Sequence, residues 1–237
     1  MCGRYTLTTP PEALRDLFAF EGPSPNLAPR YNIAPTQDAP VVRRREDGDG
    51  RELALLRWGL VPSWSKEPKS GYSTINARAE TVAEKPAFRR PMRSRRCLVP
   101  ADGFYEWRPA GRRKQPYRIV MKDGAPFAFA GLWDRWRGGD GETIESFTII
   151  VTEANALLRP IHDRMPVILD PADYAAWLEA GPEAVPYLKD LLRPYPAEMM
   201  TAYPVDPRVG NPRHDDPALI EPLSDPVAGD LFAAGPG

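Results

Sequence analysis

Proline is the feature that most limits how this chain can fold. It occupies 29 of the 237 positions, more than twice its usual share. Because proline lacks a backbone N–H, it interrupts helix interiors and central strands. A bundle of long helices is therefore excluded, and short helices and strands separated by turns are expected. The length suffices for one large domain with a full core.

Apolar runs bounded by turn residues predict a series of short elements. Strands are expected at 2–7, 40–45, 52–58, 117–122, 126–133, 146–152 and 166–169, with hairpin turns at 47–50 and 123–124. Helices are expected at 10–20, 153–159, 171–180 and 182–193, and residues 21–40 as mostly loop. A capping box from Thr9 to Glu12, with proline at the first helical position, marks the first helix. These elements predict an α+β domain built on mostly antiparallel strands.

The net charge of −1 conceals two halves of opposite sign. Residues 1–140 carry a net +9 and residues 141–237 a net −10. The densest basic stretch, 85–118, holds 11 Lys and Arg against two acidic residues. Such a patch is typical of a protein that binds a phosphate backbone. The alternative is a solvated surface whose arginines pair with acids of the second half.

Other features exclude several classes of protein. Two cysteines, Cys2 and Cys97, rule out a disulfide scaffold and a four-cysteine zinc site, and they fit a reducing cytosol. Two histidines are too few for a three-histidine metal site. No apolar run is long enough to span a membrane, and no secretory signal is visible. We expect a cytoplasmic protein without a metal or cofactor.

Cys2 carries the most chemical information. Methionine before a small residue is normally removed after synthesis, which would leave Cys2 with a free α-amine beside its thiol. The reference pKa values are about 7.7–8.0 for the amine and about 8.5 for the thiol, so both react near neutrality. The amine can form a Schiff base with an aldehyde, and the thiol can then add to that imine to close a thiazolidine ring. A chance cysteine in a disordered terminus is the alternative, which the strand-like sequence that follows argues against.

His162 and Glu106 are the candidates for proton transfer. His162 lies on a predicted turn, and its ordinary pKa of about 6.5 suits a proton shuttle. Glu106 lies among aromatic residues, where burial would raise the pKa of its carboxyl group. The alternatives are a histidine that hydrogen-bonds the backbone and a glutamate that pairs with a nearby arginine.

A polar cluster and two tryptophans could contact a nucleic acid. If residues 75–81 are extended, Asn76, Arg78 and Glu80 share one face, where an amide and a guanidinium suit phosphate and sugar contacts. The alternative for this segment is the start of a helix. An exposed Trp64 would provide a stacking platform for a base, whereas Trp58 is expected in the core.

The motifs that contain these residues resemble those of a known family. Six of them occur in order, at residues 1–5 (MCGRY), 31–37 (YNIAPTQ), 58–64 (WGLVPSW), 76–81 (NARAET), 96–107 (RCLVPADGFYEW) and 161–166 (IHDRMP). The chain closely resembles the SOS response-associated peptidase family, whose members are also called abasic site processing proteins. The resemblance covers residues 1–222, and the proline- and glycine-rich stretch 223–237 is expected to be a disordered tail.

The resemblance implies a fold and an activity. The fold would be a single α+β domain with a mostly antiparallel, barrel-like β core and short peripheral helices. The activity would be recognition of abasic sites in single-stranded DNA, as part of the DNA damage response. Cys2 would form a stable thiazolidine cross-link that protects the lesion. The family name adds a proposed autoproteolytic activity, and a lyase activity is a further expectation.

The resemblance also assigns site residues. The catalytic set would be Cys2, Asn76, Glu106 and His162. DNA contacts are expected from Arg4, Trp64, Arg78 and Arg164. The partner would be single-stranded DNA with abasic sites, bound by a cytoplasmic monomer that associates with the nucleoid on binding. Two other functions remain open, an N-terminal-nucleophile thiol peptidase and a non-enzymatic single-strand binder.

Overall fold

The computed structural model describes residues 2–23, 25–46, 48, 50–68, 74–111 and 113–223. The strands are β1 (Tyr5–Leu7), β2 (Arg30–Ile33), β3 (Asp38–Arg44), β4 (Arg51–Trp58), β5 (Asn76–Arg78), β6 (Arg96–Ala101), β7 (Gly103–Ala110), β8 (Arg113–Met121), β9 (Phe127–Arg137), β10 (Thr143–Glu153), β11 (Arg164–Pro166), β12 (Ile168–Leu169) and β13 (Met200–Pro204). The α-helices are α1 (Pro11–Phe18), α2 (Arg89–Ser94), α3 (Tyr174–Glu179) and α4 (Val185–Asp190). Short 3-10 helices are η2 (Pro171–Asp173), η3 (Pro182–Ala184), η4 (Ala197–Met199), η5 (Pro207–Gly210) and η6 (Pro217–Ile220).

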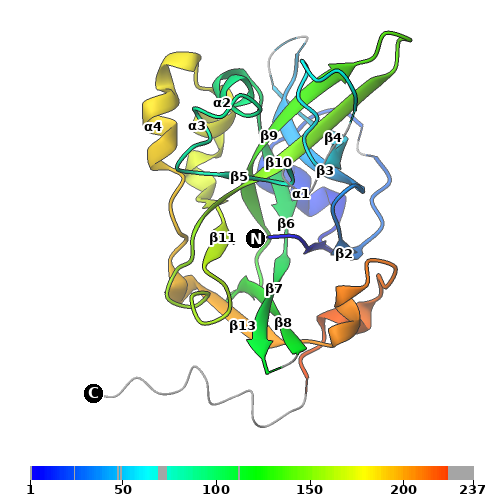
Figure 1. Cartoon of the computed structure of the whole chain (residues 1–237), viewed down its shortest axis with the longest axis vertical. Helices are drawn as coiled ribbons and strands as arrows, with labels where there is room; N and C mark the ends of the chain where they lie inside the picture. The colour runs from blue at the N-terminus through cyan, green and yellow to red at the C-terminus, as the bar shows by residue number, and fades with distance from the viewer. Residues whose placement is uncertain are drawn as a thin grey trace.

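Five strands close into a barrel. Each of β10, β4, β3, β6 and β9 pairs with the next, and β9 pairs again with β10. The pairings are antiparallel except those of β10 with β4 and with β5. The expected single α+β domain with a mostly antiparallel, barrel-like core and short peripheral helices is confirmed. Figure 1 shows α3 and α4 together on one flank of the molecule.

A second sheet carries the N-terminal strand. Its order is β13-β8-β7-β1-β2, so β1 lies between β7 and β2. The Tyr5 ring of β1 packs edge-on against Trp58 and Phe129, with centroids 5.2 and 5.8 Å away. The Trp58 ring in turn stacks on Phe147. These buried aromatics join the second sheet to the barrel and hold β1 at their junction.

A buried carboxylate fixes the end of β1. Asp102, between β6 and β7, accepts hydrogen bonds from the Thr6 hydroxyl (2.6 Å) and from the Thr9 backbone N–H (3.0 Å). The Thr9 hydroxyl also donates to Asp102, and Pro10 is the residue before α1. The predicted capping box is therefore wrong, because Asp102 engages the side chain that would have capped the helix.

Several other predicted elements need correction. The helix expected at 153–159 is absent, because β10 extends to Glu153 and residues 156–159 form turns. The expected loop at 21–40 contains β2. Residues 182–193 divide into η3 and α4. The pairing of β3 with β4 confirms the first hairpin, although Asp47 and Asp49 lie outside the described residues. The expected disordered tail also lies outside them, apart from Leu223.

Candidate functional site

Cys2 is completely buried beside the strand that carries Glu106. Tyr5 pairs with Phe104, and the Tyr105 N–H donates to the Arg4 carbonyl (3.0 Å). The segment before β1 therefore runs beside β7, and the Cys2 thiol lies close enough to Glu106 to feel its charge. Burial raises the pKa of the Cys2 thiol well above its ordinary value, and the charge of Glu106 raises it further. The thiol is therefore protonated at neutral pH.

Glu106 has the electrostatics of a proton-transfer group. Its side chain lies on β7 and is only 2% exposed. Burial raises the pKa of the carboxyl group from 4.5 to about 7. Glu106 can therefore accept and return a proton near neutral pH, as its aromatic surroundings in the sequence predicted.

The turn before β11 brings His162 toward this carboxyl group. His162 precedes β11 by two residues and is partly exposed. Its neighbour Asp163 is close enough for the Asp163 charge to raise the pKa of Glu106. The turn predicted here covers residues 156–161, and His162 lies between its end and β11.

The hydrogen bonds of His162 indicate its tautomer. The Arg164 N–H donates to Nδ1 (3.0 Å), and an Asp163 carboxylate oxygen lies at the same distance from that nitrogen. Nδ1 cannot accept a hydrogen bond from the Arg164 N–H and at the same time donate one to the Asp163 carboxylate. Because burial lowers the pKa of the imidazole, we assign the neutral ring that accepts from Arg164 and carries its proton on Nε2.

Asn76 places an amide at the end of the barrel. Asn76 on β5 lies opposite Ile149 of β10, and its side chain is 8% exposed. Its Nδ2 donates to the Ile149 carbonyl (3.4 Å). Its Oδ1 is buried and has no hydrogen-bond partner among the described residues. This oxygen is positioned to accept a hydrogen bond from a ligand or from an amine.

Sheet register brings two arginines to the same region as Asn76. In β5, Arg78 lies opposite Val151 of β10. In β11, on the other side of β10, Pro166 lies opposite Val151 and Arg164 opposite Glu153. Arg164 also forms an ion pair with Glu80. The extended segment predicted for Asn76 and Arg78 is confirmed.

Arg4 and Trp64 occupy different surroundings. The Arg4 guanidinium donates to the Val209 carbonyl (2.8 Å), the Gly210 carbonyl and the Asn32 amide oxygen. These three acceptors hold the guanidinium between β2 and η5. Trp64 is 65% exposed, whereas Trp58 is fully buried, as predicted.

The turn that presents Trp64 is fixed from both sides. The Ser63 N–H donates to Asp134 (2.8 Å), and the Trp136 indole donates to the Ser65 carbonyl (2.7 Å). A held backbone with an outward indole suits a stacking platform.

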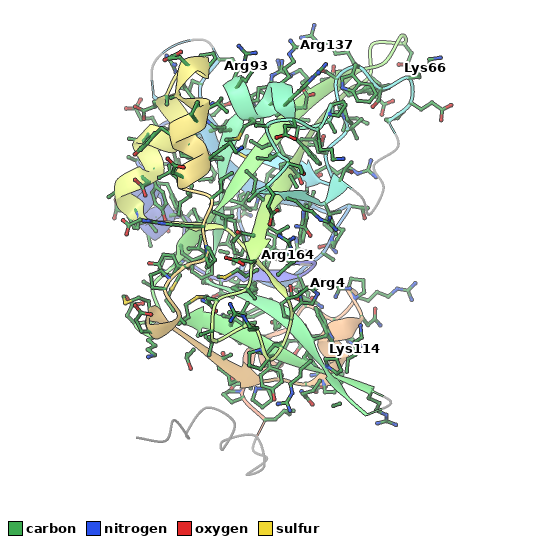
Figure 2. All side chains as sticks on the ribbon, turned by 60° about the vertical axis from the view of Figure 1, so that its left-hand side comes forward. Arg4, Lys66, Arg93, Lys114, Arg137 and Arg164 are labelled. Carbon is green, nitrogen blue, oxygen red and sulfur yellow. The ribbon has the colours of Figure 1, made fainter. Side chains whose placement is uncertain are left out.

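Basic residues are distributed along the length of the molecule. Figure 2 shows Arg164 and Arg4 near the middle of this view, with Lys66, Arg137 and Arg93 toward one end and Lys114 toward the other. Some of the positive charge of residues 1–140 is balanced by acids of the second half, because Arg43 pairs with Glu145 and Arg51 with Glu179. Pairing with acids of the second half therefore holds for Arg43 and Arg51, which lie outside the stretch 85–118.

Sequence reasoning missed the contributions of Asp163 and Asp102. The charge of Asp163 raises the pKa of Glu106, and Asp102 anchors β1, the strand that follows Cys2. Both aspartates lie within motifs, but only the fold shows what they contact. Within the described ranges, no three His, Cys, Asp or Glu side chains gather to hold a metal, and no helix is long and apolar enough to cross a membrane.

Comparisons with known proteins agree on one family. A family model described as SOS response associated peptidase (SRAP) matches residues 1–212. Abasic site processing protein YoqW of Bacillus subtilis (strain 168) is 44% identical over 224 residues, covering 93% of this chain and 99% of YoqW. Abasic site processing protein HMCES of Xenopus tropicalis is 34% identical over 263 residues, covering 93% of this chain and 78% of HMCES. The fold also matches a crystal structure of a protein from Bacteroides thetaiotaomicron that is 29% identical in sequence, with a TM-score of 0.82. The match covers 94% of this chain and 100% of the Bacteroides chain. The chain belongs to the SRAP family.

Proposed function

We propose that this protein recognises abasic sites in single-stranded DNA and captures them covalently through Cys2 after removal of Met1. The observation that carries the proposal is the burial of Cys2 beside Glu106, whose pKa is about 7. The names of the relatives YoqW and HMCES support the choice of an abasic site as substrate. Capture would protect the lesion during the response to DNA damage.

The proposed reaction begins with the amine. The closed sugar opens as its anomeric hydroxyl loses a proton and the ring oxygen gains one, which the Nε2–H of His162 can supply. The Cys2 amine adds to the resulting aldehyde, and the carbinolamine loses water to give a Schiff base. Because the buried thiol is protonated, its sulfur adds afterwards. Its proton passes through Glu106 to the former imine nitrogen as the C–S bond closes the thiazolidine.

The other site residues would hold the reactants. The buried Oδ1 of Asn76 can accept a hydrogen bond from the amine or a sugar hydroxyl. Arg4, Arg78 and Arg164 would contact phosphates, and Trp64 would stack on a base near the lesion. We further propose that the protein acts as a monomer in the cytoplasm and joins the nucleoid through the DNA it binds.

The experiment is a denaturing gel with a labelled oligonucleotide that contains one abasic site. Wild type should give a heat-stable adduct, and an intact oligonucleotide should give none. Cys2→Ser keeps the terminal amine but loses the thiol, so its adduct should appear only after borohydride reduction. Cys97→Ser is the matched control, because Cys97 is also fully buried, and it should retain the stable adduct.

Two outcomes would contradict the proposal. A stable adduct with Cys2→Ser in the absence of reductant would exclude the thiazolidine. Cleavage of a peptide by wild type but not by Cys2→Ser, with no DNA adduct, would favour the thiol peptidase instead.

A further inference from the structure

A groove lined by arginines lies where α2, α3 and the β3–β4 hairpin meet. Its larger hollow has a volume of about 660 Å³ and includes Arg44, Arg45, Arg93, Arg95 and Arg96. An adjoining hollow of about 460 Å³ adds Arg89 and Arg90 and shares Arg93, Ser94 and Pro182 with the first. We call the seven arginines and the space between them the arginine groove.

The two acidic side chains of the groove are neutralised from outside it. Glu46 pairs with Arg135 (2.7 Å) and Glu179 with Arg51 (2.8 Å), and neither arginine lines the groove. These two carboxylates therefore have partners other than the arginines of the groove. Within the described part of the chain, no ion pair involves Arg89, Arg90 or Arg93, and all three are exposed.

The floor of the groove is rigid, whereas its rim is open. Arg96 is buried and donates to the Met92 carbonyl (2.9 Å) and to carbonyls of Trp177 and Ala180. Arg95 pairs with Asp134 and lies over the Trp133 ring at 5.1 Å. The floor thus fixes the shape of the hollow, while the exposed arginines of α2 remain available to a ligand.

We propose that the arginine groove binds the sugar–phosphate backbone of single-stranded nucleic acid. The inference rests on the proposed function, because it assigns the groove to the same DNA strand at a distance from the lesion. Guanidinium groups bind phosphate oxygens in pairs, and an array of them follows a backbone without reading its sequence. The choice of a single strand follows from the proposed function, whose substrate is single-stranded DNA.

The groove lies away from the reactive centre. β6 begins at Arg96, in the floor of the groove, and is followed by β7, which carries Glu106. A six-residue strand spans roughly 20 Å. In Figure 2, Arg93 lies toward one end of the molecule, whereas Arg164 and Arg4 lie near its middle. A strand that reaches both sites must extend several nucleotides beyond the abasic sugar.

The test compares two triple variants with equal loss of charge. The groove variant is Arg89→Gln with Arg90→Gln and Arg93→Gln. The control variant is Lys122→Gln with Arg193→Gln and Arg213→Gln, all exposed residues that do not line the groove. Fluorescence anisotropy would measure affinity for intact oligonucleotides of about 6 and about 20 nucleotides at several salt concentrations.

The groove variant should bind the long oligonucleotide about tenfold or more weakly, with the slope of log K against log salt reduced by about 2. Its affinity for the short oligonucleotide and its adduct yield at saturating DNA should match wild type. The control variant should keep the wild-type salt slope. An unchanged slope in the groove variant would overturn the proposal, even if abasic adducts still form. If wild type bound an acidic peptide more tightly than DNA, and the groove variant lost that peptide binding, nucleic acid would be the wrong partner for the groove.

Loss of long-strand binding in the groove variant would support the groove even if no adduct forms on abasic DNA. Failure of the groove and failure of the proposed chemistry therefore give different results.

Discussion

At the scale of single residues, the buried Glu106 predicts how stability depends on pH. Burial raises the pKa of its carboxyl group from 4.5 to about 7. Between these values the folded state holds a proton that the unfolded state releases, so the free energy of unfolding falls as pH rises through this window. The contribution is about 3 kcal/mol. Glu106→Gln, which cannot ionise, should lack this loss, as measured by urea denaturation at pH 4.5, 6 and 7.5.

Comparison of wild type with Glu106→Gln across the window isolates this group from other titrations. The difference in unfolding free energy should move in favour of the variant as pH rises. A constant difference would mean that Glu106 ionises as it would in water, and its assigned role in proton transfer would lose its basis.

The two tryptophans of one motif should respond differently to truncation. Trp64 is 65% exposed, so Trp64→Ala should leave thermal stability unchanged and weaken single-strand binding by about 1–3 kcal/mol. Trp58 is fully buried, so Trp58→Ala should destabilise the fold by about 3–5 kcal/mol. Thermal denaturation and anisotropy measure the two effects. Full DNA affinity in Trp64→Ala would exclude the stacking platform.

At the scale of elements, the stability of the fold should depend on the carboxylate of Asp102, which anchors β1. Asp102 accepts from Thr6 and Thr9 and faces the buried Arg118. Asp102→Asn replaces one accepting oxygen by a donor and leaves the Arg118 charge without its partner. We expect a loss of about 3–5 kcal/mol in unfolding free energy.

Chemical denaturation checks this expectation, with Asp190→Asn, an exposed carboxylate in α4, as the control within about 0.5 kcal/mol of wild type. Equal stability of the two variants would show that Asp102 does not hold β1.

The elements that could be predicted are those whose sequence carries a local signal. The β3–β4 hairpin was found because turn residues interrupt apolar runs. The hairpin predicted at 123–124 was wrong: a turn forms at Asp123, but β8 and β9 on its two sides belong to different sheets and do not pair with each other. β6 was missed because it is buried along its whole length and shows no alternation. The predicted helix at 153–159 was wrong because β10 continues to Glu153, which pairs with Arg164 of β11, and Pro160 leaves room for turns only.

At the scale of the whole molecule, the site depends on contacts that no local pattern encodes. Glu106 could be identified as a candidate from its aromatic neighbours, but its place beside Cys2 results from the pairing of β1 with β7. The parallel pairing of β5 with β10, which places Arg78 opposite Val151, could not be predicted because no local sequence pattern indicates it. The resemblance to a family supplied the set of site residues, and the fold supplied the physical connection between several of them.

The charge split also has meaning only in the folded molecule. Arg43, Arg51 and Arg30 pair with acids of the second half, which stabilises the packing of the two halves. Within the described part of the chain, Arg89, Arg90 and Arg93 of the arginine groove take no part in such ion pairs. Net charge therefore underestimates how strongly this surface can attract a polyanion.

Intact-mass spectrometry of the purified protein, before and after incubation with an abasic oligonucleotide, tests the central claim most directly. The free protein should lack Met1, and the adduct should weigh the sum of protein and oligonucleotide less one water. The Cys2→Ser protein should show no such species without reductant. A protein that retains Met1 and still forms the adduct would contradict the assignment of the Cys2 amine and thiol as the reacting groups.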